Sequence, residues 1–280
     1  MKLRTITLLA LFSLTASQAH ARISVMCSLF PVYDFTRTIT GTLADVTLIL
    51  PPGVEPHEYE PSPRDIIALN DADMFIFTGA DMEAWAAKIS HTLTHTRIVD
   101  ASVGIETVNN DPHVWLDLSL AHKMAVNILE ALCDIDPVNA ETYSRNAETL
   151  RAGLDELDGK FSAMRKDKTL VFAGEFAAGY FVRRYGFDYV SAYDGENEPS
   201  LRRMTEIIRH IQQTGTRYIF TDIGAVSPVT REIASQTGAE ILTFGTGHVA
   251  PGNMTFLQMM TDNYHHISEA MNDDSEITAD

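Results

Sequence analysis

Cysteine is scarce in this sequence, with Cys27 and Cys133 the only two among 280 residues. Two thiols are too few for a metal site built from cysteine, and whether they pair in a disulfide is left open by the sequence. Long hydrophobic runs are also scarce. No stretch beyond the N-terminal region approaches the roughly 20 apolar residues of a membrane-spanning helix. The sequence therefore argues against a cysteine-rich metal site and against a membrane domain.

Positive charge is in short supply as well. Lysine and arginine total 21 against 38 aspartates and glutamates, which gives a formal net charge of −17. Such a surplus disfavours nucleic acids and anionic membranes as partners and mildly favours cations. Part of the surplus lies in residues 271–280, which we expect to form a solvated acidic tail.

The first residues have the pattern of an export signal. Lys2 and Arg4 precede the apolar run ITLLALFSL, and AHA at 19–21 has the small-x-small pattern of signal peptidase sites. We predict a signal peptide over residues 1–21 and a mature chain that begins near Arg22. Cys27 lies in VMCS, which is not a lipobox, so we expect a periplasmic protein without a lipid anchor.

Strand-like and helical stretches alternate along the rest of the chain. The strand-like runs fall at 22–28, 45–50, 73–77, 97–100, 169–174, 187–193, 217–222 and 240–245. Helical patterns fit around 31–40, 63–71, 81–94, 118–133, 176–185, 199–214, 228–237 and 254–270. Strands that alternate with helices indicate mostly parallel sheets covered by helices. We predict an α/β protein with two lobes, residues 22–135 and 168–270.

A long one-faced helical pattern separates the two lobes. Over residues 136–167 the apolar positions recur at alternating spacings of three and four. They are Ala140, Tyr143, Ala147, Leu150, Leu154, Leu157, Phe161 and Met164. An ordinary surface helix would have the same pattern. The position of residues 136–167 between the lobes instead favours a rigid helix of roughly 40 Å that joins the lobes.

Five side chains able to bind a metal fall at or beyond the carboxyl ends of predicted strands. They are His57, His113, Glu175, Asp222 and His248. Open α/β sheets bind ligands at this edge, so the five could meet in one cleft between the lobes. Imidazole nitrogens and carboxylate oxygens are ligands for Zn²⁺, Mn²⁺ and Fe²⁺. A ligating histidine also needs an acceptor for its second ring nitrogen, for which Glu58, Glu60 and Asp117 are nearby candidates.

Each of these residues also has an ordinary structural explanation. A loop histidine beside proline, such as His57, is usually only exposed, and Glu175 or Asp222 could cap the following helix. The other histidines fall in helical patterns without converging partners, so we expect them to lie on the solvated surface. They are His91, His95, His122, His210, His265 and His266.

Taken together, the chain resembles the metal-binding receptors of zinc, manganese and iron ABC importers. The resemblance covers nearly the whole mature chain and is strongest in GVEPHEYEPSPRDI, DPHVWLD and GYFVRRYGF. It implies metal ligation by His57 and His113, and by Glu175, five residues before Tyr180. The family usually places an aspartate near the last strand, whereas this chain has His248 in FGTGHVAPG. The resemblance thus implies His248 as fourth ligand, with Asp222 as its substitute.

The resemblance also implies the function. We expect a monomeric periplasmic receptor that captures a divalent transition metal (Zn, Mn or Fe) between its lobes and delivers it to an ABC permease in the inner membrane. Glutamate at position 175 and the lack of a long histidine-rich loop favour manganese or iron.

Three alternatives remain open at this point. A secreted metallohydrolase using a similar site is the main one, although the sequence lacks an HExxH motif and a GxSxG elbow. A receptor for an organic solute is the second, with Trp85 and Trp115 as the only tryptophans for its pocket. An adhesin or structural module at a surface is the third. We expect no enzymatic activity.

Overall fold

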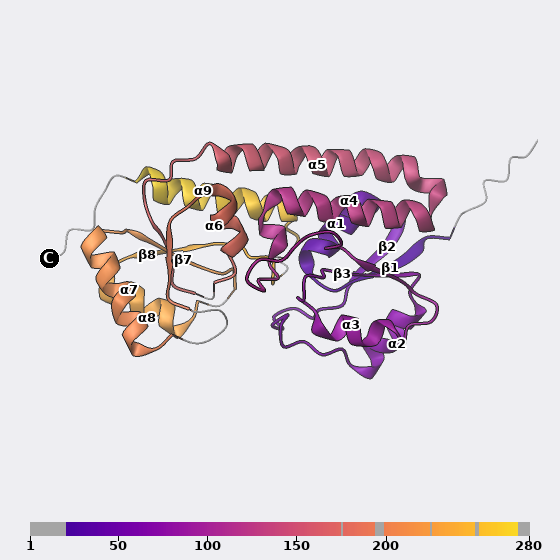
Figure 1. Ribbon diagram of the computed structural model, residues 1–280, viewed down its shortest axis with the longest axis horizontal. Helices are drawn as coiled ribbons and strands as arrows, with labels where there is room; N and C mark the ends of the chain where they lie inside the picture. Colours follow the sequence, from indigo (N-terminus) through magenta and orange to yellow (C-terminus); the bar gives the residue numbers. More distant parts are fainter. Residues whose placement is uncertain (1–20, 175, 194–198, 225, 250–251, 274–280) are drawn as a thin grey trace, which may run out of the picture.

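The structure is a computed structural model that describes residues 21–174, 176–193, 199–224, 226–249 and 252–273. Each half of the molecule contains one four-stranded parallel sheet, as the sequence predicts (Figure 1). The first sheet has the order β2-β1-β3-β4, with strands β1 (Ile23–Cys27), β2 (Ala44–Leu48), β3 (Met74–Phe77) and β4 (Arg97–Asp100). The second has the order β6-β5-β7-β8, with β5 (Leu170–Phe172), β6 (Tyr189–Ser191), β7 (Tyr218–Thr221) and β8 (Glu240–Thr243).

Helices connect the strands and cover the sheets. The first half contains α1 (Phe30–Thr40), α2 (Pro63–Asp71), α3 (Ala84–Ser90) and α4 (Leu118–Ile135). The second half contains α6 (Gly179–Tyr185), α7 (Leu201–Thr214), α8 (Pro228–Thr237) and α9 (Phe256–Asn272). Short 3-10 helices η1 (Val114–Leu116) and η2 (Pro137–Asn139) precede α4 and follow it. No helix in the described ranges is long and apolar enough to cross a membrane.

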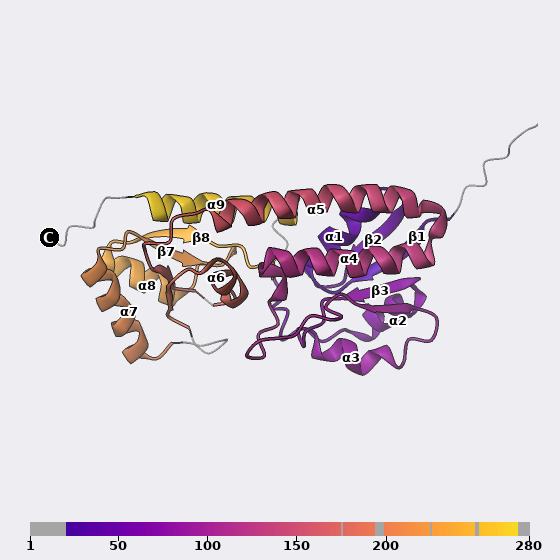
Figure 2. The same cartoon turned by 45° about the horizontal axis from the view of Figure 1, so that its top comes forward.

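The long helix between the lobes is shorter than the sequence predicts. α5 spans Ala140–Ser162, 23 residues, because η2 takes up the residues before it. At its end, Lys166 donates to the carbonyls of Ser162, the last helical residue, and of Met164. At 1.5 Å per residue it is about 35 Å long. It packs on α1 and α4 and reaches α9 (Figures 1 and 2). The lobe boundaries at residues 135 and 168 remain a prediction.

Other helix boundaries also differ from the sequence-based prediction, among them the end of α3 at Ser90 rather than residue 94 and the start of α6 at Gly179 rather than residue 176. Helix α3 begins at Ala84 rather than residue 81, because Ala80 and Asp81 have φ values of 54° and 65°, which an α-helix excludes. Helix α9 ends at Asn272, so the first two residues of the predicted acidic tail are helical. Residues 274–280 and most of the predicted signal peptide, residues 1–20, lie outside the described residues.

One hydrophobic core runs through both halves of the molecule. It joins β1, α1, α4 and α5 to Leu170 and Phe172 of β5, to Phe244 and to the buried face of α9. A smaller cluster fills the other face of the second sheet, where Val171 of β5 packs against α7 and α8. The alternation along β5 is that of a strand buried on both faces. Because the larger cluster is continuous, the two sheets are parts of one packed body.

Both cysteines are free thiols, which settles the open question about a disulfide. Cys27 is fully buried at the end of β1, beside Thr36, and burial raises the pKa of its thiol to about 12.

Candidate metal centre

Three histidine side chains from distant parts of the chain meet at one point. His57 follows β2, His113 follows β4 and His248 follows β8, so loops at the carboxyl ends of both sheets contribute. The ring centroid of His57 lies 5.4 Å from that of His113 and 5.3 Å from that of His248. The ring centroids of His113 and His248 are 4.8 Å apart. One ring nitrogen from each histidine lies within 4.8 Å of the other two.

These distances fit a shared metal ion after a small closing movement. Two nitrogens bound at 2.0–2.1 Å to one tetrahedral zinc ion are roughly 3.4 Å apart. The three rings therefore need to draw together by no more than about 1.4 Å. The Nε2 atoms of all three are buried, and those of His113 and His248 have no hydrogen-bond partner among the described residues. Buried polar atoms without partners are costly, so a ligand at this point would satisfy them.

A rigid loop holds His57. Proline is frequent in residues 51–63, and backbone hydrogen bonds from Glu58 to Glu55 and from Tyr59 to Pro56 form turns around His57. The Tyr59 ring is buried against Trp85, with ring centroids 5.7 Å apart, and its hydroxyl donates to Asp65. Asp65 and Ser62 form a capping box at the start of α2. The turns and the contacts of Tyr59 thus hold the loop that carries His57.

A tight turn and an aspartate orient His113. Asn109 and Asn110 have φ values of 57° and 55°, a left-handed conformation that asparagine tolerates better than most residues. The turn places Asp111 Oδ1 3.0 Å from the backbone nitrogen of His113 and 2.7 Å from its Nδ1. With Nδ1 donating to Asp111, Nε2 carries the lone pair that faces the other histidines.

The residue that holds the His113 ring is therefore not one of the three predicted candidates. Asp117 instead caps α4 by accepting from Ser119, and lies 3.5 Å from Arg184. Glu58 and Glu60 are exposed. The signal for Asp111 was present in the motif NDPHVWLD as an acid two residues before the histidine, the spacing of a side chain that turns back on the backbone.

His248 is the most enclosed of the three, with 4% of its surface exposed. Burial lowers the pKa of His248 well below its ordinary value, and the nearby His113 and His57 lower it further. The imidazole is therefore neutral at neutral pH, which is the form that binds metal ions.

Asp222, the predicted substitute for His248, lies outside the group of converging ligands. Its Oδ1 accepts from the backbone nitrogens of Ile223 (2.7 Å) and Thr246 (3.0 Å), and its Oδ2 accepts from the Thr246 hydroxyl (2.6 Å). Burial raises the pKa of the Asp222 carboxyl, while these hydrogen bonds act to lower it. Asp222 thus supports the loop that carries His248. Glu175 lies outside the described residues.

The sequence predicts that the remaining histidines all lie on the solvated surface, but only some of them do. His91, His95 and His265 are exposed, whereas His122, His210 and His266 are half-buried. His266 Nδ1 lies 2.7 Å from the carbonyl oxygen of Thr243, so this ring helps α9 pack against the end of β8. None of these six joins the three converging histidines among the described residues.

A cavity of about 340 Å³ lies elsewhere in the second lobe. Lys168, Leu170, Arg217 and Tyr218 are among its lining residues, so it opens at the amino ends of β5 and β7. Ligands of parallel α/β sheets bind at the opposite edge. The chemistry of this chain therefore points to the histidines rather than to the cavity.

A comparison with known protein families matches most of the chain. Residues 25–270 match the family model described as zinc-uptake complex component A, periplasmic. The chain belongs to this family. The fold with two parallel sheets is also that of the solved relatives.

Individual relatives cover most of the chain. The high-affinity zinc uptake system protein ZnuA of Bacillus subtilis is 30% identical over 257 residues, 83% of this chain and 81% of that protein. The zinc-binding protein AdcA of Streptococcus pyogenes serotype M3 is 30% identical over 79% of this chain, but the match spans only half of AdcA. A crystal structure of the metal-dependent lipoprotein YcdH of Bacillus subtilis has a TM-score of 0.80 at 28% identity, covering 89% of this chain and 99% of that one.

Proposed function

We propose that this chain is the receptor of an ABC importer that captures Zn²⁺ outside the cytoplasm and delivers it to a membrane permease. The convergence of three imidazoles from two sheets on one point carries the proposal. Family membership supports it, because the family description names zinc uptake and the periplasm. The acidic surface, with a net charge of −17, favours approach of cations.

His57, His113 and His248 are the proposed ligands, with Glu175 as a fourth. Imidazole nitrogens are borderline ligands that suit Zn²⁺ well, whereas Mn²⁺ prefers sites dominated by oxygen. The preference for manganese or iron inferred from Glu175 finds no support in the relatives' names, which specify zinc. A binding role without catalysis fits better than a metallohydrolase, because the family description names zinc uptake.

Capture and release would need only small movements. The core is continuous between the halves, and α5 packs on α1 and α4 as well as on α9. A wide hinge motion would break this packing, whereas drawing the three rings together requires a shift on the scale of an ångström. We propose that the receptor acts as a monomer and that contact with the permease moves the ligand loops enough to release the ion.

Elemental analysis of protein purified from its native compartment tests the proposal. Wild-type protein is expected to carry about one zinc ion per chain, and His57→Ala, His113→Ala and His248→Ala are expected to lose it. The exposed histidines provide matched controls, so His91→Ala and His95→Ala should retain the metal. The proposal is contradicted if the wild type carries no zinc, or if all variants carry as much zinc as the wild type.

A further inference from the structure

One hydrogen bond ties the two histidine-bearing regions together across the molecule. The indole Nε1–H of Trp115, in η1, donates to the carbonyl oxygen of Thr246 at 2.7 Å. The two residues are 131 positions apart, and both are buried. Trp115 follows His113 by two residues, and Thr246 precedes His248 by two. The bond therefore joins the loop of one proposed ligand directly to the loop of another.

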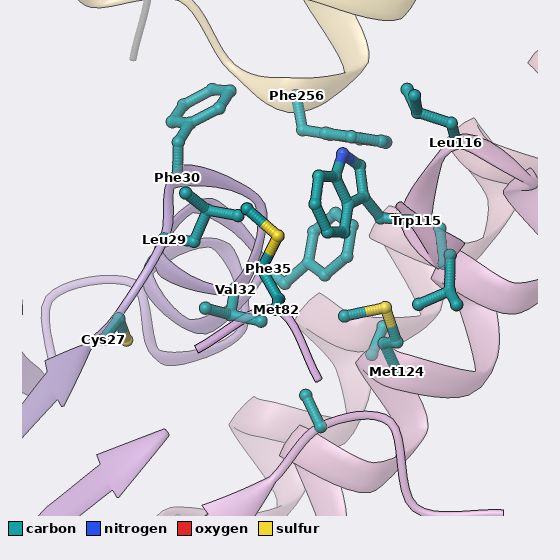
Figure 3. Packing of buried hydrophobic residues seen from close by; sticks show 14 of the residues in the cluster. Cys27, Leu29, Phe30, Val32, Phe35, Met82, Trp115, Leu116, Met124 and Phe256 are labelled. Carbon is teal, nitrogen blue, oxygen red and sulfur yellow. The ribbon is translucent and has the colours of Figure 1, made fainter. Parts of the chain in front are cut away.

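The same indole packs against both imidazoles. Its ring centroid lies 5.4 Å from that of His113 and 6.3 Å from that of His248. On its other sides it lies in the core with Phe35 and Phe256 (Figure 3). Its side chain is fully buried. A large, rigid ring held this firmly can act as a spacer between the two histidines.

Thr246 receives matching support from the second sheet. Its hydroxyl and backbone nitrogen donate to Asp222, which follows β7, while its carbonyl accepts from Trp115. The backbone nitrogen of His248 in turn lies 3.3 Å from the Thr246 hydroxyl. The His248 loop is thus held by Asp222 of its own lobe and by Trp115 of the other lobe.

The loop also fits closely against Trp115 at its next residue. Gly247 has φ of 88°, and a Cβ atom there would lie 3.0 Å from Trp115 Nε1 and 3.0 Å from a side-chain carbon of Pro31. Only glycine meets both the backbone conformation and the space. Two successive residues, Thr246 and Gly247, therefore lie against the indole, and these contacts determine the position of His248 relative to His113.

We propose that Trp115 is a positioning residue of the metal site, which sets the separation of His113 and His248. The inference rests on the proposed metal-binding function. Without the indole N–H, the Thr246 carbonyl is left buried and unpaired, so the loop is expected to shift to reach another donor. His248 then leaves the position from which its nitrogen can share an ion with His113.

A buried tyrosine outside the ligand loops provides the control variant. The hydroxyl of Tyr143, in α5, is buried and donates to Asp136. Trp115→Phe and Tyr143→Phe therefore both remove a buried hydrogen-bond donor, and only the former removes a hydrogen bond to a ligand loop. We expect Trp115→Phe to weaken Zn²⁺ binding by about 10- to 100-fold, the usual effect of losing a group that orients a ligand. Tyr143→Phe should bind as the wild type does.

Cobalt gives a reading that lowered stability alone would not change. The visible absorption bands of bound Co²⁺ depend on coordination geometry, so they report where the ligands lie. At saturating Co²⁺, Trp115→Phe is expected to show altered bands, and Tyr143→Phe the wild-type spectrum. Identical spectra and affinities for Trp115→Phe and wild type overturn the inference. If the wild type itself binds neither ion, the proposed function fails instead.

A second substitution covers the case in which Trp115→Phe does not fold. In the Trp85→Phe background the remaining tryptophan can be replaced during expression by β-(3-benzothienyl)alanine, which has the same shape with sulfur in place of N–H. The packing is then kept and only the hydrogen bond is lost. Compared with Trp85→Phe protein that carries ordinary tryptophan, weaker Zn²⁺ binding and altered Co²⁺ bands support the inference, and unchanged values overturn it.

Discussion

Asp111 decides which nitrogen of His113 is available to a metal ion. It accepts from Nδ1 at 2.7 Å and from the backbone nitrogen of His113, so the ring is fixed both in tautomer and in direction. Carboxylates in this role usually raise ligand basicity as well as holding the ring.

We expect Asp111→Ala to lower the affinity for Zn²⁺ by about 10- to 100-fold, because the His113 ring loses its acceptor and can rotate. Asp111→Asn keeps a carbonyl oxygen that can accept from Nδ1 and should retain most of the affinity. Competition titration against a chromophoric zinc chelator measures both. Equal losses in the two variants would show that charge, rather than orientation, is what the aspartate supplies.

His248 makes the metal-free protein sensitive to acid. Its pKa in the folded protein lies below that of the unfolded chain, so below about pH 6.5 the unfolded chain binds a proton that the folded protein excludes. The free energy of unfolding therefore falls as the pH drops from 7 towards 5, by up to about 1.4 kcal/mol per pH unit from this group.

Replacement of this histidine should remove that contribution. Urea unfolding in the presence of a chelator, at pH 8, 7, 6 and 5, is expected to show a shallower loss of stability for His248→Gln than for the wild type. Parallel pH profiles for the two proteins would mean that the His248 ring titrates at its ordinary pKa, contrary to its burial.

The residues of the site differ in how far the sequence could reveal them. His57, His113 and His248 stand beside proline or glycine after predicted strands, and the structure brings these three together. Asp111 had a local signal that was passed over. The contacts of Trp115 and Asp222 with Thr246 had none, because they join residues 131 and 24 positions apart. Such pairs become visible only when the packing of both sheets is known.

At the level of whole elements, helix α9 depends on a residue of α1. Asp34 is almost completely buried, and its Oδ2 accepts from the backbone nitrogen of Phe256, the first residue of α9, at 2.8 Å. Its Oδ1 accepts from Arg37 at 2.7 Å. A carboxylate at a helix N-terminus is favoured by the helix dipole. The contact also fixes the start of α9 near the His248 loop.

Asp34→Ala is expected to lower the free energy of unfolding by about 2–3 kcal/mol, because a buried helix start loses its acceptor and Arg37 loses its partner. Asp45→Ala is the control, since Asp45 pairs with Arg22 at the exposed surface. That change should cost less than about 1 kcal/mol. Urea denaturation compares them, and a similar loss in both would refute the structural role of Asp34.

Strands and most helices were predictable because each has a local pattern. All eight strands fall where alternation of strand-like and helical runs placed them, and Ser62 with Pro63 marks the start of α2 in the sequence as in the structure. The errors occur where tertiary or backbone constraints act. The left-handed conformations at Ala80 and Asp81 delay α3, and Lys166 marks the end of α5 before the apolar pattern is exhausted.

For the molecule as a whole, the continuous core predicts cooperative unfolding. Side chains of α1, α5, β5 and α9 belong to one buried cluster, so neither sheet can open without exposing part of it. We expect a single transition in urea, with the same midpoint by far-UV circular dichroism and by tryptophan fluorescence. Trp85 and Trp115 report the first half of the chain, whereas dichroism reports both. Two separated midpoints would show that the halves unfold independently.

The central claim is that His57, His113 and His248 share one metal ion. Anomalous diffraction at the zinc absorption edge, on crystals of the zinc-loaded full chain, tests it most directly. We predict one strong peak per chain, about 2.0–2.1 Å from a ring nitrogen of each of these histidines. A peak located elsewhere, or one that touches fewer than two of the three rings, would contradict the account.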